Sequence, residues 1–225
     1  MIYIALLNKI SIEEALHWLI SEISSASAQY QIDAGLIVTI SRGDYACDHL
    51  QSILSAYKSL GFPKEIIGLD LAGNENDSIP SSLPMQFTEA KREFGLGITI
   101  HAGETGNPEN IIQAIEHFNA DRIGHGTAAT LSQKAMNLIK DRDICIEVCP
   151  ISNRLTGAVK AQEPHPLVRF IENDLPFVIC SDNPAIHKKG LSSDYLMFFE
   201  ECNNQKILDE MFERQKKYSF LGRRN

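Results

Sequence analysis

Residues 96–104 (LGITIHAGE) combine a short run rich in β-branched side chains with a histidine and a glutamate. Such a run is typical of a strand buried on both faces, which places His101 and Glu104 at the carboxyl end of a strand. In α/β folds, ligands bind at that end. An imidazole there can bind a metal ion, and a carboxylate can carry a proton. Taken alone, the pair is explained more simply as an ordinary strand-to-loop junction.

The same pattern of a buried strand followed by polar side chains recurs along the chain. The other predicted strand tips carry Asp70, Gly73 and Glu75 (GLDLAGNE), His125 (RIGHG), Ser152 and Asn153 (EVCPISN), and Asp182 and Asn183 (CSDNP). Two histidines and an aspartate on three tips form a nitrogen and oxygen ligand set, which suits zinc or another divalent transition metal better than calcium. No tip combines a serine with a base or holds a cysteine cluster. The pattern therefore indicates a water nucleophile activated by a metal, with Glu104 moving protons.

The elements that position these residues alternate between strands and helices. Strands are predicted at residues 34–41, 66–73, 96–104, 121–126, 144–150 and 177–182, and helices at 11–29, 48–60, 85–94, 108–119, 131–140, 166–173 and 193–218. This alternation indicates a parallel sheet covered by helices. With no linker or break in composition, we expect one domain over residues 1–225.

An open doubly wound sheet and a closed (β/α)8 barrel both fit such an alternation. No strand is followed by a glycine-rich nucleotide-binding motif, and polar residues on many successive strand tips favour the TIM-type barrel. Residues 2–7 (IYIALL) are a candidate seventh strand beside the six predicted ones, whereas a closed barrel has eight. We therefore expect an α/β fold of the TIM-barrel type that is incomplete on its N-terminal side.

Composition restricts the partners and the compartment. The 225 residues carry a formal net charge of −8, which argues against a nucleic-acid partner. The five cysteines show no CxxC spacing, and no apolar run approaches the length of a membrane span. The start of the chain lacks the basic leader and the small-residue cleavage site of a signal peptide. We expect a cytoplasmic protein with no membrane partner and reduced cysteines.

Five ordered motifs, HAGE, RIGHG, EVCP followed by S-N, LTGAV and SDNP, resemble those of the adenosine deaminase family. GLDLAGNE and the LSSDY segment also resemble that family, and the similarity runs from about residue 30 to YSFL near the end. The resemblance implies a TIM-type barrel and the zinc-dependent hydrolytic deamination of adenosine to inosine and ammonia, a step of purine metabolism. Within the family, DLAG and LTGAV favour a nucleoside over a free base as substrate.

The resemblance also implies roles for individual residues. His101 and Asp182 would be zinc ligands. Glu104 would protonate a ring nitrogen of the purine, and His125 would orient the attacking water and help to deprotonate it.

Two further residues would bind the substrate. The backbone of Gly73 would contact the purine ring. Asn183 stands where the family more usually has a second aspartate that hydrogen-bonds the other side of the purine. An amide can still donate to a ring nitrogen without being protonated, so we expect this change to be tolerated.

The main difference from the family's pattern concerns the first strand of the barrel. The family opens with a strand that ends in His-x-His and supplies two more zinc ligands, and this chain contains no His-x-His. Only half of the shell for the single zinc ion is therefore present, whereas catalytic zinc sites normally use at least three protein ligands. An incomplete ring of strands would also expose apolar surface, and self-association of the chain is expected.

Three hypotheses follow from these residues. The chain is an adenosine deaminase-type hydrolase, or a non-catalytic fragment or degenerate relative that is inactive without an N-terminal segment. The third hypothesis, an unrelated metal hydrolase on a similar barrel, is disfavoured by the order of the motifs.

Overall fold

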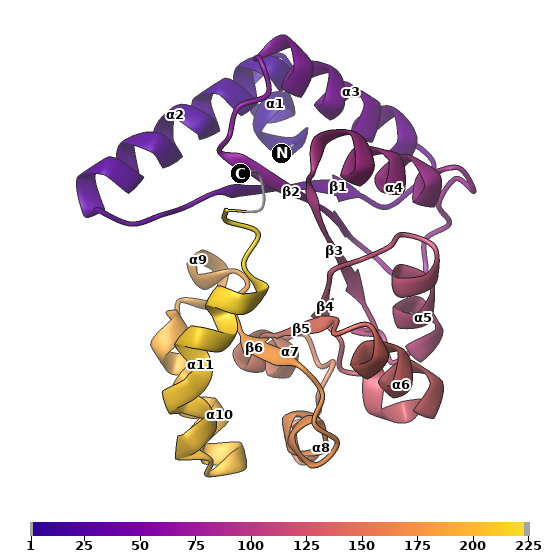
Figure 1. The fold of residues 1–225 in the computed structure, drawn as a ribbon, viewed down its shortest axis with the longest axis vertical. Coiled ribbons are helices and arrows are strands. Elements are labelled where there is room, and N and C mark those ends of the chain that lie inside the picture. The colour runs from indigo at the N-terminus through magenta and orange to yellow at the C-terminus, as the bar shows by residue number, and fades with distance from the viewer. Residues whose placement is uncertain (1, 223–225) are drawn as a thin grey trace. The chain divides into compact units, whose positions relative to one another are not determined.

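The computed structural model describes residues 2–222, and for residues 2 and 3 it describes the backbone only. Figure 1 shows an α/β fold in which strands and helices alternate. In the sheet, neighbouring strands follow one another in the same order as in the chain. They are β1 (Leu36–Ser41), β2 (Ile66–Ala72), β3 (Gly97–Ala102), β4 (Arg122–His125), β5 (Cys145–Val148) and β6 (Phe177–Ile179). The pairs β1–β2, β4–β5 and β5–β6 are parallel. The expected α/β architecture with six strands is confirmed.

Helices connect successive strands, as a parallel sheet requires, and further helices precede β1 and follow β6. Before β5 they are α1 (Ile2–Asn8), α2 (Ile12–Tyr30), α3 (Ala46–Ser59), α4 (Leu83–Phe94), α5 (Pro108–Glu116), the short 3-10 helix η1 (Ala129–Leu131) and α6 (Gln133–Asp141). After β5 they are α7 (Pro150–Leu155), α8 (Leu167–Glu172), α9 (Pro184–His187), α10 (Leu191–Cys202) and α11 (Gln205–Tyr218). Within the described residues, no helix is both long and apolar enough to span a bilayer.

Residues 2–7 form most of helix α1, so the expectation of a seventh strand there was wrong. Ala5 is buried, and Leu6 and Leu7 are exposed, which is the one-sided burial of a surface helix rather than that of a strand with two covered faces. The helix packs on α2, and the backbone N–H of Ile10 donates to the carbonyl of Ala5 just past the end of α1. A six-residue apolar run has no periodicity that separates a strand from a helix.

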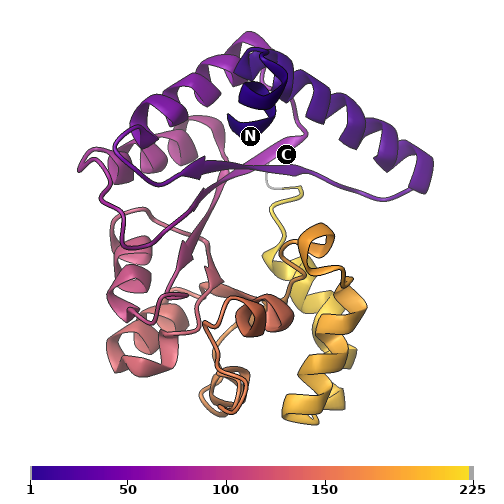
Figure 2. The same ribbon diagram turned by 180° about the vertical axis from the view of Figure 1, so that it is seen from behind.

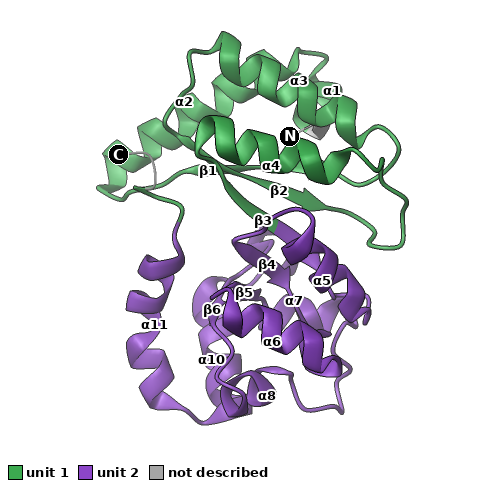
Figure 3. Ribbon diagram, turned by 45° about the vertical axis from the view of Figure 1, so that its right-hand side comes forward, with its two compact units in different colours: residues 1–99, 220–225 green, residues 100–219 purple. Residues whose placement is uncertain are grey.

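The chain divides into two compact units (Figure 3). Unit 1 holds residues 2–99 and 220–222 of the described chain, and unit 2 holds residues 100–219, so that β3 contributes residues to both. The expectation of a single domain stays a prediction.

In unit 1, helices α1 to α4 lie on one side of strands β1 and β2, as both the front and the back view show (Figures 1 and 2). Ser11 caps the N-terminus of helix α2, where its hydroxyl accepts from the backbone N–H of Glu14. Its buried face is small and apolar, with Ala15 and Leu16 at 0% exposure. In unit 1, α2 packs on both α1 and α3.

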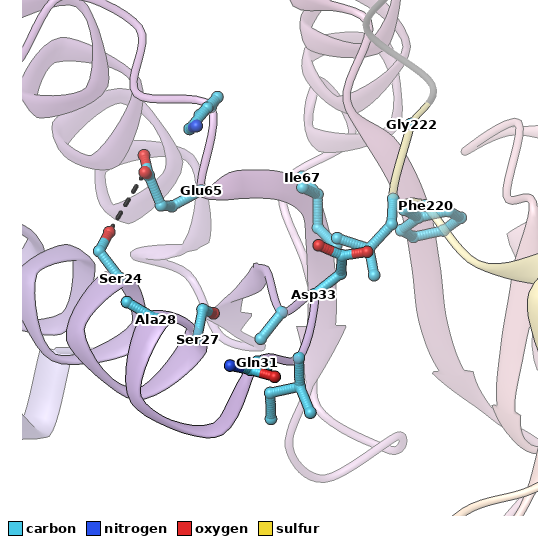
Figure 4. Close-up of a pocket in the computed structure, with 13 residues that line it drawn as sticks. Ser24, Ser27, Ala28, Gln31, Asp33, Glu65, Ile67, Phe220 and Gly222 are labelled. Carbon is cyan, nitrogen blue, oxygen red and sulfur yellow. Dashed lines mark hydrogen bonds between the residues drawn. The ribbon is translucent and has the colours of Figure 1, made fainter.

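The described chain ends in unit 1, where Phe220 is 2% exposed. Its ring lies against Gly68 on β2 and Gly97 on β3, where added Cβ atoms would be 2.8 and 2.4 Å from ring carbons. The two glycines therefore leave the space that the ring occupies. Figure 4 shows Phe220 beside a pocket of about 750 Å³ that Ser24, Glu65 and neighbouring residues line at the amino ends of β1 and β2.

The sequence pattern predicted only some of the helices in unit 2. Helices α5, α6, α8, α10 and α11 were expected, whereas α7 and α9 were not. Helix α11 packs on β6, where the side-chain amide of Gln215 donates to the carbonyl of Ile179 over 3.0 Å. Phe177 of β6 packs on Phe198 of α10, with ring centroids 6.0 Å apart.

Candidate active site

Strand β3 places His101 one residue before its end and Glu104 two residues after it. The turn between them requires Gly103, whose φ of +84° lies in the left-handed region and whose added Cβ would be 2.7 Å from Cδ1 of Ile111. The hydroxyl of Thr127 donates to the carbonyl of Gly103 over 2.8 Å. The turn is thereby held in place, and the side chain of Glu104 is 27% exposed.

His125 is the last residue of the neighbouring strand β4 and is 4% exposed. Its ring faces that of His101, with centroids 5.1 Å apart and planes at 67°. Gly124 permits this approach, because a Cβ there would lie 3.2 Å from the Cα and ring of His101. Nε2 of His125 is 3.7 Å from Oε2 of Glu104. These three predicted site residues therefore lie together at the carboxyl ends of β3 and β4.

Burial governs the charge of His125. Loss of solvation lowers its pKa, and the neighbouring His101 lowers it further, while Glu104, Asp182 and Glu147 act in the opposite direction. The net direction is downward, so the imidazole is neutral at neutral pH. Because His101, Glu104 and Asp182 all act on this ring, the four predicted catalytic and metal-binding residues share one electrostatic environment.

Asp182 follows β6 by three residues and has a φ of +54°. Its Oδ2 accepts a hydrogen bond of 2.6 Å from the hydroxyl of Ser152, which is 1% exposed. The next residue, Asn183, directly precedes the four-residue helix α9. Both side chains are exposed, so the carboxylate of Asp182 is held by a buried hydroxyl on one side and open on the other.

Helix α7 carries polar contacts to three of the predicted site residues. Besides Ser152, it contributes Asn153, whose Nδ2 lies 3.0 Å from Nδ1 of His125. Thr156, at the end of the helix, donates from Oγ1 to Oε1 of Glu104 over 3.0 Å. Sequence reasoning read Ser152 and Asn153 as a polar strand tip without giving them roles, and it missed Thr156. The available signal was their place in the EVCP-S-N and LTGAV motifs.

A buried carboxylate from a distant helix fixes the start of α7. Asp194 of α10 is 1% exposed, and its Oδ1 accepts from the backbone N–H of Ile151 over 3.0 Å. Burial raises the pKa of Asp194, although the hydrogen bond from Ile151 opposes this. The carboxylate stabilises a helix that begins at Pro150, where its first backbone N–H groups have no partners within the helix.

Space for a ligand opens beside Glu104. A pocket of about 520 Å³ is lined by Glu104, Thr105, Gly106, Thr156, Gly157 and Ala158. The carboxylate of Glu104 thus has a cavity on one side and the ring of His125 on another, which is the placement that a proton carrier needs.

The described residues contain no group of three or more histidine, cysteine, aspartate or glutamate side chains able to hold a metal ion. His101 and Asp182, the two predicted zinc ligands, are therefore not joined by a third within that part of the chain. His165, a further buried histidine, uses Nδ1 to accept from the backbone N–H of Leu167 over 3.2 Å, as a core histidine does.

Gly73 lies directly after β2, in unit 1, and has a φ of +112°. Nearby, the hydroxyl of Thr39 donates to the buried carboxylate of Asp70 over 3.2 Å. Gly73 belongs to unit 1 and the other predicted site residues belong to unit 2. The role of Gly73 toward a purine stays a prediction.

The chain resembles known proteins over nearly its whole length. A family model described as "Adenosine deaminase" matches residues 3–221. The adenosine deaminase of Clostridium kluyveri is 33% identical over 186 residues, which cover 83% of this chain and 53% of that relative. The chain thus spans about half the length of the curated relatives it matches.

Two solved structures show the same fold. An adenine deaminase from Arthrobacter aurescens gives a TM-score of 0.86 at 21% identity, covering 96% of this chain and 65% of that one. An amidohydrolase from Burkholderia ambifaria, solved with bound zinc, gives a TM-score of 0.84 at 22% identity, covering 96% of this chain and 60% of that one. At such identities the likeness concerns the fold, and it agrees with an incomplete TIM-type barrel. Because the family model covers almost all of the sequence, the chain belongs to the adenosine deaminase family.

Proposed function

We propose that this chain provides the proton-transfer residues and part of the metal shell for the hydrolytic deamination of adenosine. In that reaction water adds at the ring carbon that bears the amino group, the C–N bond breaks, and inosine and ammonia are formed. The observation that carries the proposal is the pairing of Glu104 with His125, 3.7 Å apart at the carboxyl ends of neighbouring strands.

The roles follow from the surroundings of each group. Glu104 borders a cavity and is partly exposed, so it can reach a ring nitrogen of a small-molecule purine nucleoside and deliver a proton there. His125 is buried and neutral, and it would orient the attacking water. Gly73 and Asn183 are assigned to purine binding on the strength of the family motifs that contain them.

A metal is supported by family membership and by the zinc ion bound in the Burkholderia ambifaria amidohydrolase. Zinc in such a site supplies Lewis acidity. The residues described here do not fit a resident zinc by themselves, because His101 and Asp182 are two ligands and a catalytic site takes at least three. We therefore assign no step to zinc within this chain, and the proposal requires further ligands from a segment that carries His-x-His.

The incomplete metal group also favours a second candidate function. A chain with two of the ligands and about half the length of its relatives would be a non-catalytic fragment or a degenerate member of the family. For the catalytic candidate we propose a place in purine nucleoside metabolism. A cytoplasmic location is supported by the five free cysteines, which fit a reducing compartment.

One experiment tests whether the residues of this chain are catalytically competent once the missing ligands are supplied. Adenosine absorbance is followed with the chain alone and with a chimera in which the N-terminal part of the Clostridium kluyveri relative precedes this chain, each with and without added zinc. We expect zinc-dependent deamination by the chimera and none by the chain alone. The matched control is the chimera with Glu104→Gln. A folded chimera that binds one zinc ion per chain and still leaves adenosine unchanged would refute catalytic competence and favour the degenerate relative.

A further inference from the structure

The side chain of Asn153 stands between the core and the ring of His125. Asn153 is 0% exposed, and its Nδ2 lies 3.0 Å from Nδ1 of His125. An amide nitrogen has protons to give and no lone pair to offer, so Nδ1 is the acceptor in this contact. A neutral imidazole that accepts at Nδ1 carries its proton on Nε2.

The surroundings of Nε2, on the other side of the ring, also favour a proton on that nitrogen. Nε2 of His125 lies 3.7 Å from Oε2 of Glu104, and the other oxygen of that carboxylate already accepts from Thr156. A proton on Nε2 points toward negative charge, whereas a lone pair on Nε2 would face the lone pairs of the carboxylate. The field of Glu104 and the amide of Asn153 therefore favour the same tautomer.

The buried amide of Asn153 is only partly hydrogen-bonded. The carbonyl oxygen Oδ1 of Asn153 is buried without a hydrogen-bond partner among the described residues, and a buried unpartnered polar atom destabilises a fold. Its backbone is fixed on both sides, since its N–H donates to the carbonyl of Cys149 and its carbonyl accepts from Val159. Packing alone would be served better by an apolar side chain, whereas a donor aimed at His125 requires the amide.

We propose that Asn153 is a positioning residue that fixes the tautomer of His125, because its amide N–H donates to Nδ1 and thereby holds the ring proton on Nε2, toward Glu104. The mechanistic consequence rests on the proposed function. With its proton on Nε2, His125 enters the reaction as a hydrogen-bond donor that orients water, and the resting proton acceptor of the pair is Glu104.

Two other buried histidines provide internal references for a measurement. Nδ1 of His49 accepts from the backbone N–H of Ser41 over 3.3 Å, and Nδ1 of His165 accepts from the backbone N–H of Leu167 over 3.2 Å. A backbone N–H can only donate, so both neutral rings carry their proton on Nε2 whatever happens at Asn153.

The test measures the protonation state of each histidine ring nitrogen through its nitrogen-15 chemical shift. The full chain is labelled with nitrogen-15 histidine, and long-range proton–nitrogen correlation spectra are recorded at pH 8, where an ordinary histidine is neutral. The signals of His125 are identified by their loss in His125→Gln. We expect Nδ1 of His125 to have the shift of an unprotonated nitrogen, like Nδ1 of His49 and His165. If the chain self-associates, magic-angle-spinning spectra of the sedimented protein read the same shifts.

Two variants test the cause. Asn153→Leu keeps the size of the side chain and removes the donor, so the shifts of His125 should move toward a mixture of tautomers. Asn153→Asp offers only an acceptor, so Nδ1 should become protonated. The references His49 and His165 should stay unchanged in both variants.

A protonated Nδ1 in the unmodified chain would overturn the proposal, and so would an unchanged tautomer in Asn153→Leu. The shifts require no turnover, so the outcome is independent of the proposed function. An inactive chimera in which Nε2 of His125 is protonated would contradict the proposed function alone, and an active one with Nδ1 protonated would contradict this inference alone.

Discussion

Thr156 donates its hydroxyl proton to Oε1 of Glu104 over 3.0 Å. This hydrogen bond engages Oε1, so we expect Oε2, which lies 3.7 Å from Nε2 of His125, to be the oxygen that takes up and releases a proton. Thr156 itself is exposed and contributes little packing. The contact therefore orients the proton carrier without being a structural requirement, which makes its removal informative.

In the chimera, Thr156→Val should lower deamination by about 10–100-fold, because a hydrogen bond to a charged group contributes about 1.5–3 kcal/mol and each 1.36 kcal/mol is a factor of ten. The melting temperature should stay nearly unchanged. Thr88→Val, which removes a hydroxyl bond within α4, is the matched control and should leave turnover intact. Equal losses in both variants would show that Thr156 does not orient Glu104.

Replacement of the proton carrier should separate chemistry from metal binding. In the chimera, Glu104→Gln should lower turnover by about 100-fold or more, as expected when general acid–base catalysis is lost. The zinc content, measured by atomic absorption, should stay at that of the unmodified chimera. A parallel loss of zinc would identify Glu104 as a ligand instead.

The hydroxyl of Ser152 holds the carboxylate of Asp182 through a hydrogen bond of 2.6 Å. Partners of metal ligands commonly contribute about 10–100-fold to metal affinity, so Ser152→Ala should weaken zinc binding by the chimera within that range. Competition with a chromophoric chelator measures the affinity. Ser132→Ala, which removes the cap of α6, is the control and should leave the zinc affinity unaltered while lowering the melting temperature.

The stability of the chain should fall on acidification through His165. Burial, and next the nearby Arg154, lower the pKa of His165 from 6.5 to about 4. The unfolded chain binds this proton below about pH 6.5, and the folded chain binds it only near pH 4. The contribution of neutral His165 to the free energy of unfolding is therefore fully present above pH 6.5 and is lost as the pH falls from 6.5 to 4. The full shift corresponds to about 3 kcal/mol.

Denaturant unfolding of His165→Asn between pH 4 and 7 checks this effect. The asparagine oxygen can accept from Leu167 as Nδ1 does but does not titrate in this range. We expect a flatter dependence of the free energy of unfolding on pH in His165→Asn than in the unmodified chain. His117→Asn, at an exposed position, should keep the original dependence; identical curves for all three proteins would contradict the assignment.

Local sequence patterns were sufficient for the strands and for most helices. Short β-branched runs ending in polar residues mark β2 and β3 well, because a buried strand and its loop differ sharply in composition. The last strand ends at Ile179 rather than reaching Asp182, which adopts a left-handed backbone. His125 shares that conformation, and strained backbone of this kind gathers at functional sites.

Contacts between residues distant in sequence explain what the patterns missed. The sequence pattern predicts a strand that ends at Pro150 and does not predict helix α7, whose stabilising carboxylate, Asp194, lies 43 residues from Ile151. The partners of Glu104 and His125 are likewise far along the chain, at Thr156 and Asn153. Motif order could place these residues near the site, but only the fold assigns each hydroxyl or amide to one acceptor.

The chain without an added segment should bind zinc weakly, associate and fail to deaminate adenosine. His101 and Asp182 provide two ligands where a catalytic site takes at least three, and β1 forms one end of the strand order with no strand beyond it among the described residues. Such an edge pairs readily with other chains. Zinc per chain, light scattering during size-exclusion chromatography and adenosine absorbance test the three expectations, with the chimera as the reference. A monomer with near one zinc per chain and turnover of about 1–1,000 per second would contradict them, and His187→Ala would then test whether that histidine supplies a missing ligand.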